Sequence, residues 1–196
     1  LASEACKLAW RARHPATVSF WYALQEAAIA AVDFPGSVHQ VTRLKLSCRD
    51  HAGHRWLQIL LPSGNRLTYF HPEVVSTVER DEETGEERVR KSLAYWSLAT
   101  DEGGPRIWQR TFTHGGKLTG NVCQTLARDV LAHNMPAIEA AGYEIVLTVH
   151  DEVVAEAPVS LDETRMVELL ATNPPWADGL PLAAAGFHHD RYQKED

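Results

Sequence analysis

Segment 143–156 narrows the possible folds more than any other part of the sequence, because two apolar runs in it flank a short polar stretch. The first run is rich in β-branched and aromatic residues, a composition typical of a β-strand. The second run begins at Val153, and the number of polar residues between the runs fits a tight hairpin. The pattern therefore predicts a β-hairpin with buried apolar flanks that presents His150, Asp151 and Glu152 at its tip.

A carboxylate at the rim of a sheet is costly to desolvate unless a cation or hydrogen bonds compensate it. A hard divalent metal together with a phosphate substrate would provide that compensation. The alternative is structural, because an acidic hairpin tip is commonly only a solvated turn. For His150 alone, the alternative is a hydrogen-bonded turn histidine. The composition of the tip by itself leaves both interpretations open.

Four motifs along the chain resemble those of one enzyme family. The hairpin has the pattern V-H-D-E-x-V-x-E over 149–156, and the segment upstream has Q-x-x-A-x-D over 124–129. Residues 113–118 show T-x-G-G-K-L, and residues 10–15 show W-R-x-x-x-P. In this order the motifs resemble the family A DNA polymerases, which include bacterial DNA polymerase I and many phage replicases. The T-x-G-G-K-L segment is similar to that of the phage-type members.

This resemblance implies a role for each residue of the hairpin tip. Two carboxylates of the family, far apart in the sequence, hold two magnesium ions that activate the primer 3′-hydroxyl and orient the triphosphate. The hairpin motif supplies one of them, so Asp151 is the expected magnesium ligand. Glu152 is expected to be an auxiliary carboxylate, because adjacent side chains of a strand point to opposite faces. His150 is expected near the primer terminus.

The segment upstream of the hairpin contains the expected DNA contacts. Gln124 and Arg128 are four residues apart and share one helix face, and Asn121 lies one turn earlier on nearly the same face. Amide side chains can donate to minor-groove acceptors that all base pairs share, which suits sequence-independent binding. Lys117 and Arg128 are expected to contact phosphates. The alternative is an ordinary solvated helix face.

The whole sequence predicts an α+β chain with three parts. Helical periodicity in residues 1–37 predicts helices that the resemblance places in the fingers. Turn clusters between apolar runs predict three strands in a meander over 41–70, and residues 88–98 and 106–112 are expected to supply two more; together they form a β-rich inserted module at 38–112. Residues 113–196, with a helix over about 117–141, resemble the second half of the palm. The expected fold therefore has long helices packed on an antiparallel palm-type sheet with a catalytic β-hairpin, plus the β-rich insertion.

Several local predictions accompany this division. Pro136 is expected to kink or split the helix that contains it, and Gly142 is expected to end that helix. Thr84-Gly85 is expected at an exposed hairpin tip, and His188 and His189 are expected at the surface. Ser160 or Asp162 is expected to cap a last helix, and segment 173–181 is expected to be non-helical. Aromatic residues at helical spacing more often pack than stack on bases, so three are expected in the core: Trp10, Trp21 and Tyr22.

Composition and charge limit the classes of function. The 196 residues are 44% hydrophobic and 23% charged, as in an ordinary globular protein. No apolar run has the length of a membrane span and no signal peptide is recognisable, so a cytoplasmic location is expected. The three cysteines lack metal-site spacing and are expected to be free thiols. A net charge of −7 does not by itself indicate nucleic-acid binding, since such surfaces are usually basic.

The first metal-binding motif of the family and its nucleotide-gripping helix are not found in the sequence. The second carboxylate is therefore expected upstream of Leu1, and the chain is expected to be inactive alone. The expected partners are primer–template DNA, deoxynucleoside triphosphates and a replication accessory protein. Two alternatives stay open: a metal-dependent phosphohydrolase that uses the hairpin tip, and a non-catalytic interaction module in 38–112.

Overall fold

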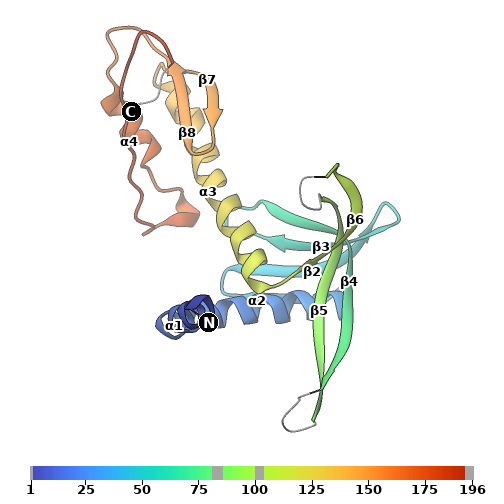
Figure 1. Cartoon of the computed structure of the whole chain (residues 1–196). Helices are drawn as coiled ribbons and strands as arrows, with labels where there is room; N and C mark the ends of the chain where they lie inside the picture. The colour runs from blue at the N-terminus through green and yellow to red at the C-terminus, as the bar shows by residue number, and fades with distance from the viewer. Residues whose placement is uncertain (1, 81–85, 100–103, 193–196) are drawn as a thin grey trace. The chain divides into compact units, whose positions relative to one another are not determined.

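The computed structural model describes residues 2–80, 86–99 and 104–192 (Figure 1). The chain forms two compact units, Leu1–Cys123 and Gln124–Asp196. Among the described residues, no helix is both long and apolar enough to cross a membrane.

The first unit begins with two helices, α1 (Ala2–Arg13) and α2 (Pro15–Asp33), as the sequence predicted. Pro15 occupies the first turn of α2, where a missing backbone N–H costs nothing and the fixed φ of proline suits the helix. The break between α1 and α2 is thus explained by the residue at which α2 begins.

Six antiparallel strands follow in a simple meander, each paired with the next along the chain. They are β1 (Val38–Val41), β2 (Leu44–His51), β3 (His54–Leu60), β4 (Arg66–Arg80), β5 (Glu87–Ala99) and β6 (Ile107–Thr113). The sequence predicted β-structure here but missed β1, because the turn that joins β1 to β2 is Thr42-Arg43, not a typical turn pair. Thr42 adopts a φ of 51° in this turn. The mixed α+β class is confirmed, whereas a palm-type sheet stays a prediction.

The core of the first unit lies between α2 and one face of this sheet. Leu24, Ala28 and Ala31 of α2 are fully buried. Alternate residues of the strands face them, among them Leu46 and Leu57, both 0% exposed. Burying one leucine side chain stabilises a fold by about 1.5–3 kcal/mol, so the leucines of this interface contribute substantially to the stability of the unit.

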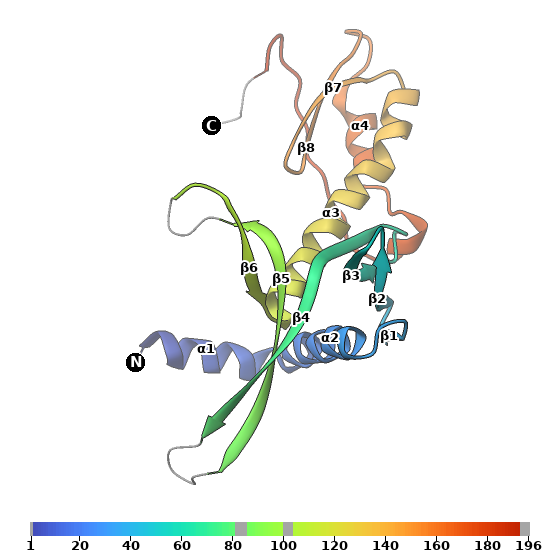
Figure 2. The same ribbon diagram turned by 90° about the vertical axis from the view of Figure 1, so that its right-hand side faces the viewer.

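β4 and β5 extend past their neighbours as a long two-stranded ribbon (Figure 2). Their pairing is interrupted by a bulge after Phe70, where His71 adopts a φ of 44°. It then continues to the pair Arg80 and Glu87. The hairpin tip predicted at 84–85 lies outside the described residues.

Two of the three aromatic residues expected in the core are exposed. Trp10 is 44% exposed and Tyr22 is 55% exposed, so the prediction was wrong for both. Tyr22 lies on the side of α2 away from the buried face that contains Leu24. Trp10 stacks on Trp21, with 5.4 Å between the ring centroids, instead of entering the core.

All three cysteines are free thiols, as expected. Cys6 and Cys123 are exposed, whereas Cys48 is buried in the sheet. Burial raises the pKa of the Cys48 thiol, which favours its protonated form.

The long helix α3 (Gly115–Ala140) starts in the first unit and continues into the second. It contains Pro136 without interruption, so the predicted split into two helices does not occur. The loss of one backbone hydrogen bond is tolerated within 26 helical residues. Gly142, with a φ of 97°, ends this part of the chain as the sequence indicated.

The second unit also contains a two-stranded sheet of β7 (Glu144–Val149) and β8 (Glu152–Glu156), followed by α4 (Glu163–Leu170). Asp162 caps α4 by accepting a hydrogen bond from the backbone N–H of Thr164 at 3.1 Å, which confirms one of the two predicted caps. A single 3₁₀ turn, Pro175–Ala177, interrupts the segment that was expected to be non-helical. The hairpin is thus a separate sheet from the six-stranded meander.

Candidate functional site

The predicted hairpin is present, but its turn is shorter than the sequence indicated. Val149 pairs with Glu152, so only His150 and Asp151 form the turn. Glu152 is the first residue of β8 and not part of the turn, so the predicted tip of three residues was one residue too long. His150 has a φ of 55°, a left-handed conformation that two-residue hairpin turns require and that histidine tolerates better than most residues.

The polar residues at this turn are open to solvent. His150, Asp151 and Glu152 are all exposed. None of the three side chains has a hydrogen-bond or ion-pair partner in the part of the chain that the structure describes. The Asp151 carboxylate therefore presents oxygen atoms that nothing else in the described structure uses, which is the donor type that magnesium prefers.

The apolar flanks of the hairpin are less buried than predicted. Val146 is 51% exposed and Leu147 is 47% exposed, so the expectation of buried flanks was wrong for β7. A bulge between Ile145 and Leu147 shifts the register at this point. Two strands alone cannot cover their own faces, and a hairpin of this kind needs another element for a full core.

Hydrogen bonds from buried side chains hold the base of the hairpin. Tyr143, 3% exposed, donates its hydroxyl to the backbone carbonyl of Asp162 at 2.6 Å. The side-chain amide of Asn134 donates to the carbonyls of Leu170 at 3.0 Å and Thr172 at 2.9 Å. These bonds connect α3, the start of β7 and both ends of α4. The sequence motifs did not indicate either residue, although Tyr143 directly follows the glycine that ends the helical segment.

The predicted DNA-binding residues are distributed along α3. Gln124 and Arg128, in the second unit, are exposed, and so is Lys117 in the first unit. Asn121 is only partly exposed, and its amide donates to the Tyr69 hydroxyl at 3.0 Å. Burial raises the pKa of Tyr69. Asn121 thus has a structural contact with β4 in addition to the DNA contact predicted for it.

The two glycines of the T-x-G-G-K-L motif have different surroundings. A Cβ atom on Gly115 would overlap the backbone carbonyl of Trp21, with the carbonyl carbon at 2.6 Å. The Gly115 N–H also donates to the Gln25 side chain at 2.9 Å. Gly116 has more room, since a Cβ there would approach the His114 ring at 3.2 Å. The motif therefore lets α3 start in direct contact with the backbone of α2.

The described residues contain no complete metal site. Within the described ranges, no group of three or more His, Cys, Asp or Glu residues is arranged to hold a metal ion. His188, which the sequence indicated as a surface residue, pairs with Glu163 at 3.0 Å. A backbone hydrogen bond and the contact with His188 lower the pKa of the Glu163 carboxyl. Glu163 and His188 therefore interact with each other.

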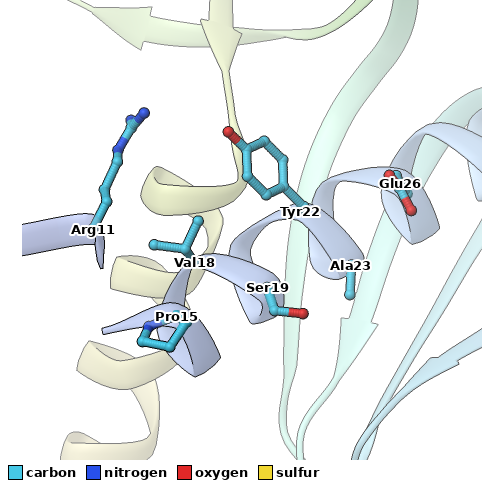
Figure 3. Close-up of a pocket in the computed structure, with 7 residues that line it drawn as sticks. All are labelled: Arg11, Pro15, Val18, Ser19, Tyr22, Ala23 and Glu26. Carbon is cyan, nitrogen blue, oxygen red and sulfur yellow. The ribbon is translucent and has the colours of Figure 1, made fainter. Parts of the chain in front are cut away.

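A shallow hollow of about 510 Å³ lies on α1 and α2. Figure 3 shows the Arg11 side chain extending from α1 and the Tyr22 ring from α2. Arg11 and Pro15 of the W-R-x-x-x-P motif both line the hollow, together with Glu26. The motif thus contributes to a surface depression with one basic and one acidic side chain.

Nearly the whole chain is similar in sequence to part of a phage protein. It is 40% identical over 191 residues to a protein named DNA polymerase from Bacillus phage SP02, a match that covers 95% of this chain. The chain spans about a quarter of that protein, 26% of its length. No protein-family profile matches the chain, and no solved structure matches it. The resemblance to a phage DNA polymerase is confirmed, whereas membership of family A stays a prediction.

Proposed function

We propose that this chain is a segment of a family A phage DNA polymerase that extends a primer on a DNA template. The similarity to the phage polymerase carries this proposal, and the V-H-D-E motif on an exposed hairpin turn supports it. The substrates would be primer–template DNA and deoxynucleoside triphosphates, in the cytoplasm of the infected host. An accessory protein of phage replication is a further proposed partner.

The hairpin would provide one part of a two-metal centre. Asp151 would hold magnesium through its free carboxylate oxygens, and the second carboxylate would come from outside this sequence. When bound, the two ions supply charge stabilisation of the transferring phosphoryl group. Glu152 is the first residue of the strand that follows Asp151, and its carboxylate would be auxiliary to the site. His150 would lie near the primer terminus.

Three exposed side chains of α3 would bind the duplex. Gln124 would donate to the minor-groove acceptors common to all base pairs. Arg128 and Lys117 would contact phosphates. Asn121 would be a weaker contact, because its amide also bonds to Tyr69.

The isolated 196-residue chain is expected to give no primer extension above background with magnesium and all four deoxynucleotides. One hairpin carboxylate cannot position two metal ions, and the chain contains no motif resembling the nucleotide-gripping helix. A standard gel assay of primer extension measures this. Robust extension by the chain alone would show that the second carboxylate lies within it.

Gln124→Ala, made in the complete polymerase, is expected to weaken primer–template binding about equally across sequences. A lost hydrogen bond of this kind costs about 1–3 kcal/mol if it is buried in the complex. Binding titrations on several duplexes measure the change. His133→Ala is the matched control, since His133 is exposed on the opposite side of the same helix. An effect no larger than that of the control would identify Gln124 as an ordinary solvated residue.

A further inference from the structure

The six-stranded sheet has a second face, opposite α2, on which aromatic side chains from four neighbouring strands form a row. The strand pairing places Trp56 opposite Phe70, and Phe70 opposite Trp96. Trp108 follows on β6, where it pairs with Leu98, two residues from Trp96. Side chains of a strand alternate between faces, so these residues lie opposite the buried ones such as Leu57.

The aromatic rings contact one another and line an open groove. The ring centroids of Trp56 and Phe70 are 4.8 Å apart, and those of Phe70 and Trp108 are 5.5 Å apart. The groove has a volume of about 410 Å³. Trp108 is 54% exposed and Leu98 is 56% exposed, so much of this apolar surface is accessible.

Basic side chains surround the row. In the strand register, Arg49 lies opposite Trp56, and Arg110 lies opposite Trp96. Lys45 and Arg66 lie on the two strands beside Leu60, whose side chain is on the same face of the sheet as that of Trp56. All four basic side chains are exposed. We call this combination of four aromatic and four basic residues the aromatic-basic face.

The charge of this face contrasts with that of the chain. The Glu73 carboxylate lies on the same face, and it accepts hydrogen bonds from the ring N–H of Trp96 at 3.4 Å and from the guanidinium group of Arg110 at 3.2 Å. Lys45, Arg49 and Arg66 have no ion-pair partner among the described residues. In a protein with a net charge of −7, this local excess of unpaired basic residues favours a polyanionic ligand.

We propose that the aromatic-basic face binds single-stranded DNA. Proteins that bind single strands without sequence preference stack bases on aromatic side chains and neutralise phosphates with adjacent basic residues. An apolar protein segment would fit the rings, but it would leave the surrounding cations without partners. The choice of DNA over RNA rests on the proposed polymerase function, whereas the stacking and the charge do not.

The test is fluorescence anisotropy of a labelled oligothymidine with the 196-residue chain and its variants. Trp108→Ala is expected to weaken binding about 5- to 150-fold, the effect of losing one stacked base. Trp108→Phe, which retains a ring, should restore most of the affinity. Phe34→Ala is the matched control, because Phe34 is 67% exposed at the end of α2 and does not belong to the face.

Arg49→Ala tests the basic part of the face. The slope of log affinity against log salt is expected to fall by about 0.7 for a lost phosphate contact to a single strand. Lys7→Ala, a change of an exposed basic residue on α1, should leave the slope unchanged. Thermal unfolding of each variant shows whether a loss of affinity comes from a loss of folding.

Equal affinities for the parental chain, Trp108→Ala and Arg49→Ala would overturn the proposal. Self-association that Trp108→Ala abolishes, without DNA binding, would identify a protein interface instead. Equal binding of oligouridine would overturn the choice of DNA while the stacking site stands. None of these results bears on Asp151 or Gln124, so a failure here is distinct from a failure of the proposed polymerase function.

Discussion

Asp151→Asn, made in the complete polymerase, is expected to reduce the rate of primer extension by on the order of a thousandfold or more. Transition-state stabilisation by metal ions amounts to several kcal/mol, and each 1.36 kcal/mol is about tenfold in rate. The amide keeps the shape of the side chain but removes the charge that would hold magnesium. The steady-state extension rate of the variant measures the effect.

Folding and DNA binding should survive this substitution. Asp151 is exposed in a two-residue turn and has no partner in the described structure, so no core contact is lost. The affinity for DNA should hold or rise, because one negative charge near the phosphates is removed. The thermal midpoint and a DNA titration separate these effects from the loss of rate.

Glu152→Gln is the matched comparison, because it removes the same charge from the next residue. Glu152 pairs with Val149 in the ladder and so belongs to β8, whereas Asp151 lies at the tip, in the turn. We therefore expect a smaller loss of rate than for Asp151→Asn. A near-parental rate for Asp151→Asn would mean that the hairpin tip is only a solvated turn, and the proposed catalytic centre would be lost.

Gly115→Ala is expected to destabilise the first unit by about 1–3 kcal/mol or more, the usual cost of overpacking. The added Cβ would overlap the backbone of Trp21, which cannot move aside as a flexible side chain can. For a chain of this size, each kcal/mol lowers the melting temperature by about 2–4 °C. Thermal unfolding followed by circular dichroism measures the shift.

The same helix offers two controls for this prediction. Gly120→Ala has nothing within 4 Å of the new methyl group, and it should stabilise the helix by up to about 1 kcal/mol. The melting temperature of Gly116→Ala should lie between those of the other two variants, because only the His114 ring must shift. Equal melting temperatures for Gly115→Ala and Gly120→Ala would show that α2 and α3 do not approach each other as closely as the structure indicates.

Local signals in the sequence were sufficient for the elements near the hairpin. The strand composition before His150, the stop at Gly142 and the cap at Asp162 all act through residues close in the chain. Pro15 likewise separates the first two helices by its own backbone chemistry. Such features depend on conformational propensity and on hydrogen bonds between residues that are close in the chain, so the sequence pattern is sufficient to predict them.

The errors arose where a residue's environment depends on distant parts of the chain. The burial of Trp10 and Tyr22 depended on what packs against their helices, and the periodicity of the helices does not contain that information. Glu152 was predicted in the turn because it is polar. Its pairing with Val149, which places it in β8, is not visible in the sequence. The exposed flank at Val146 follows from a hairpin of only two strands.

Residue patterns were sufficient to predict the α+β class, the hairpin that carries Asp151, and the resemblance to a phage DNA polymerase. They did not show that Trp56 and Trp108 belong to one row, because three successive strand registers bring these distant residues to the same face. They also did not show that Gly115 meets the backbone of Trp21, since this contact joins two helices that are far apart in the chain. A motif reports the residue types that a site needs, whereas long-range pairing decides which side chains share a surface.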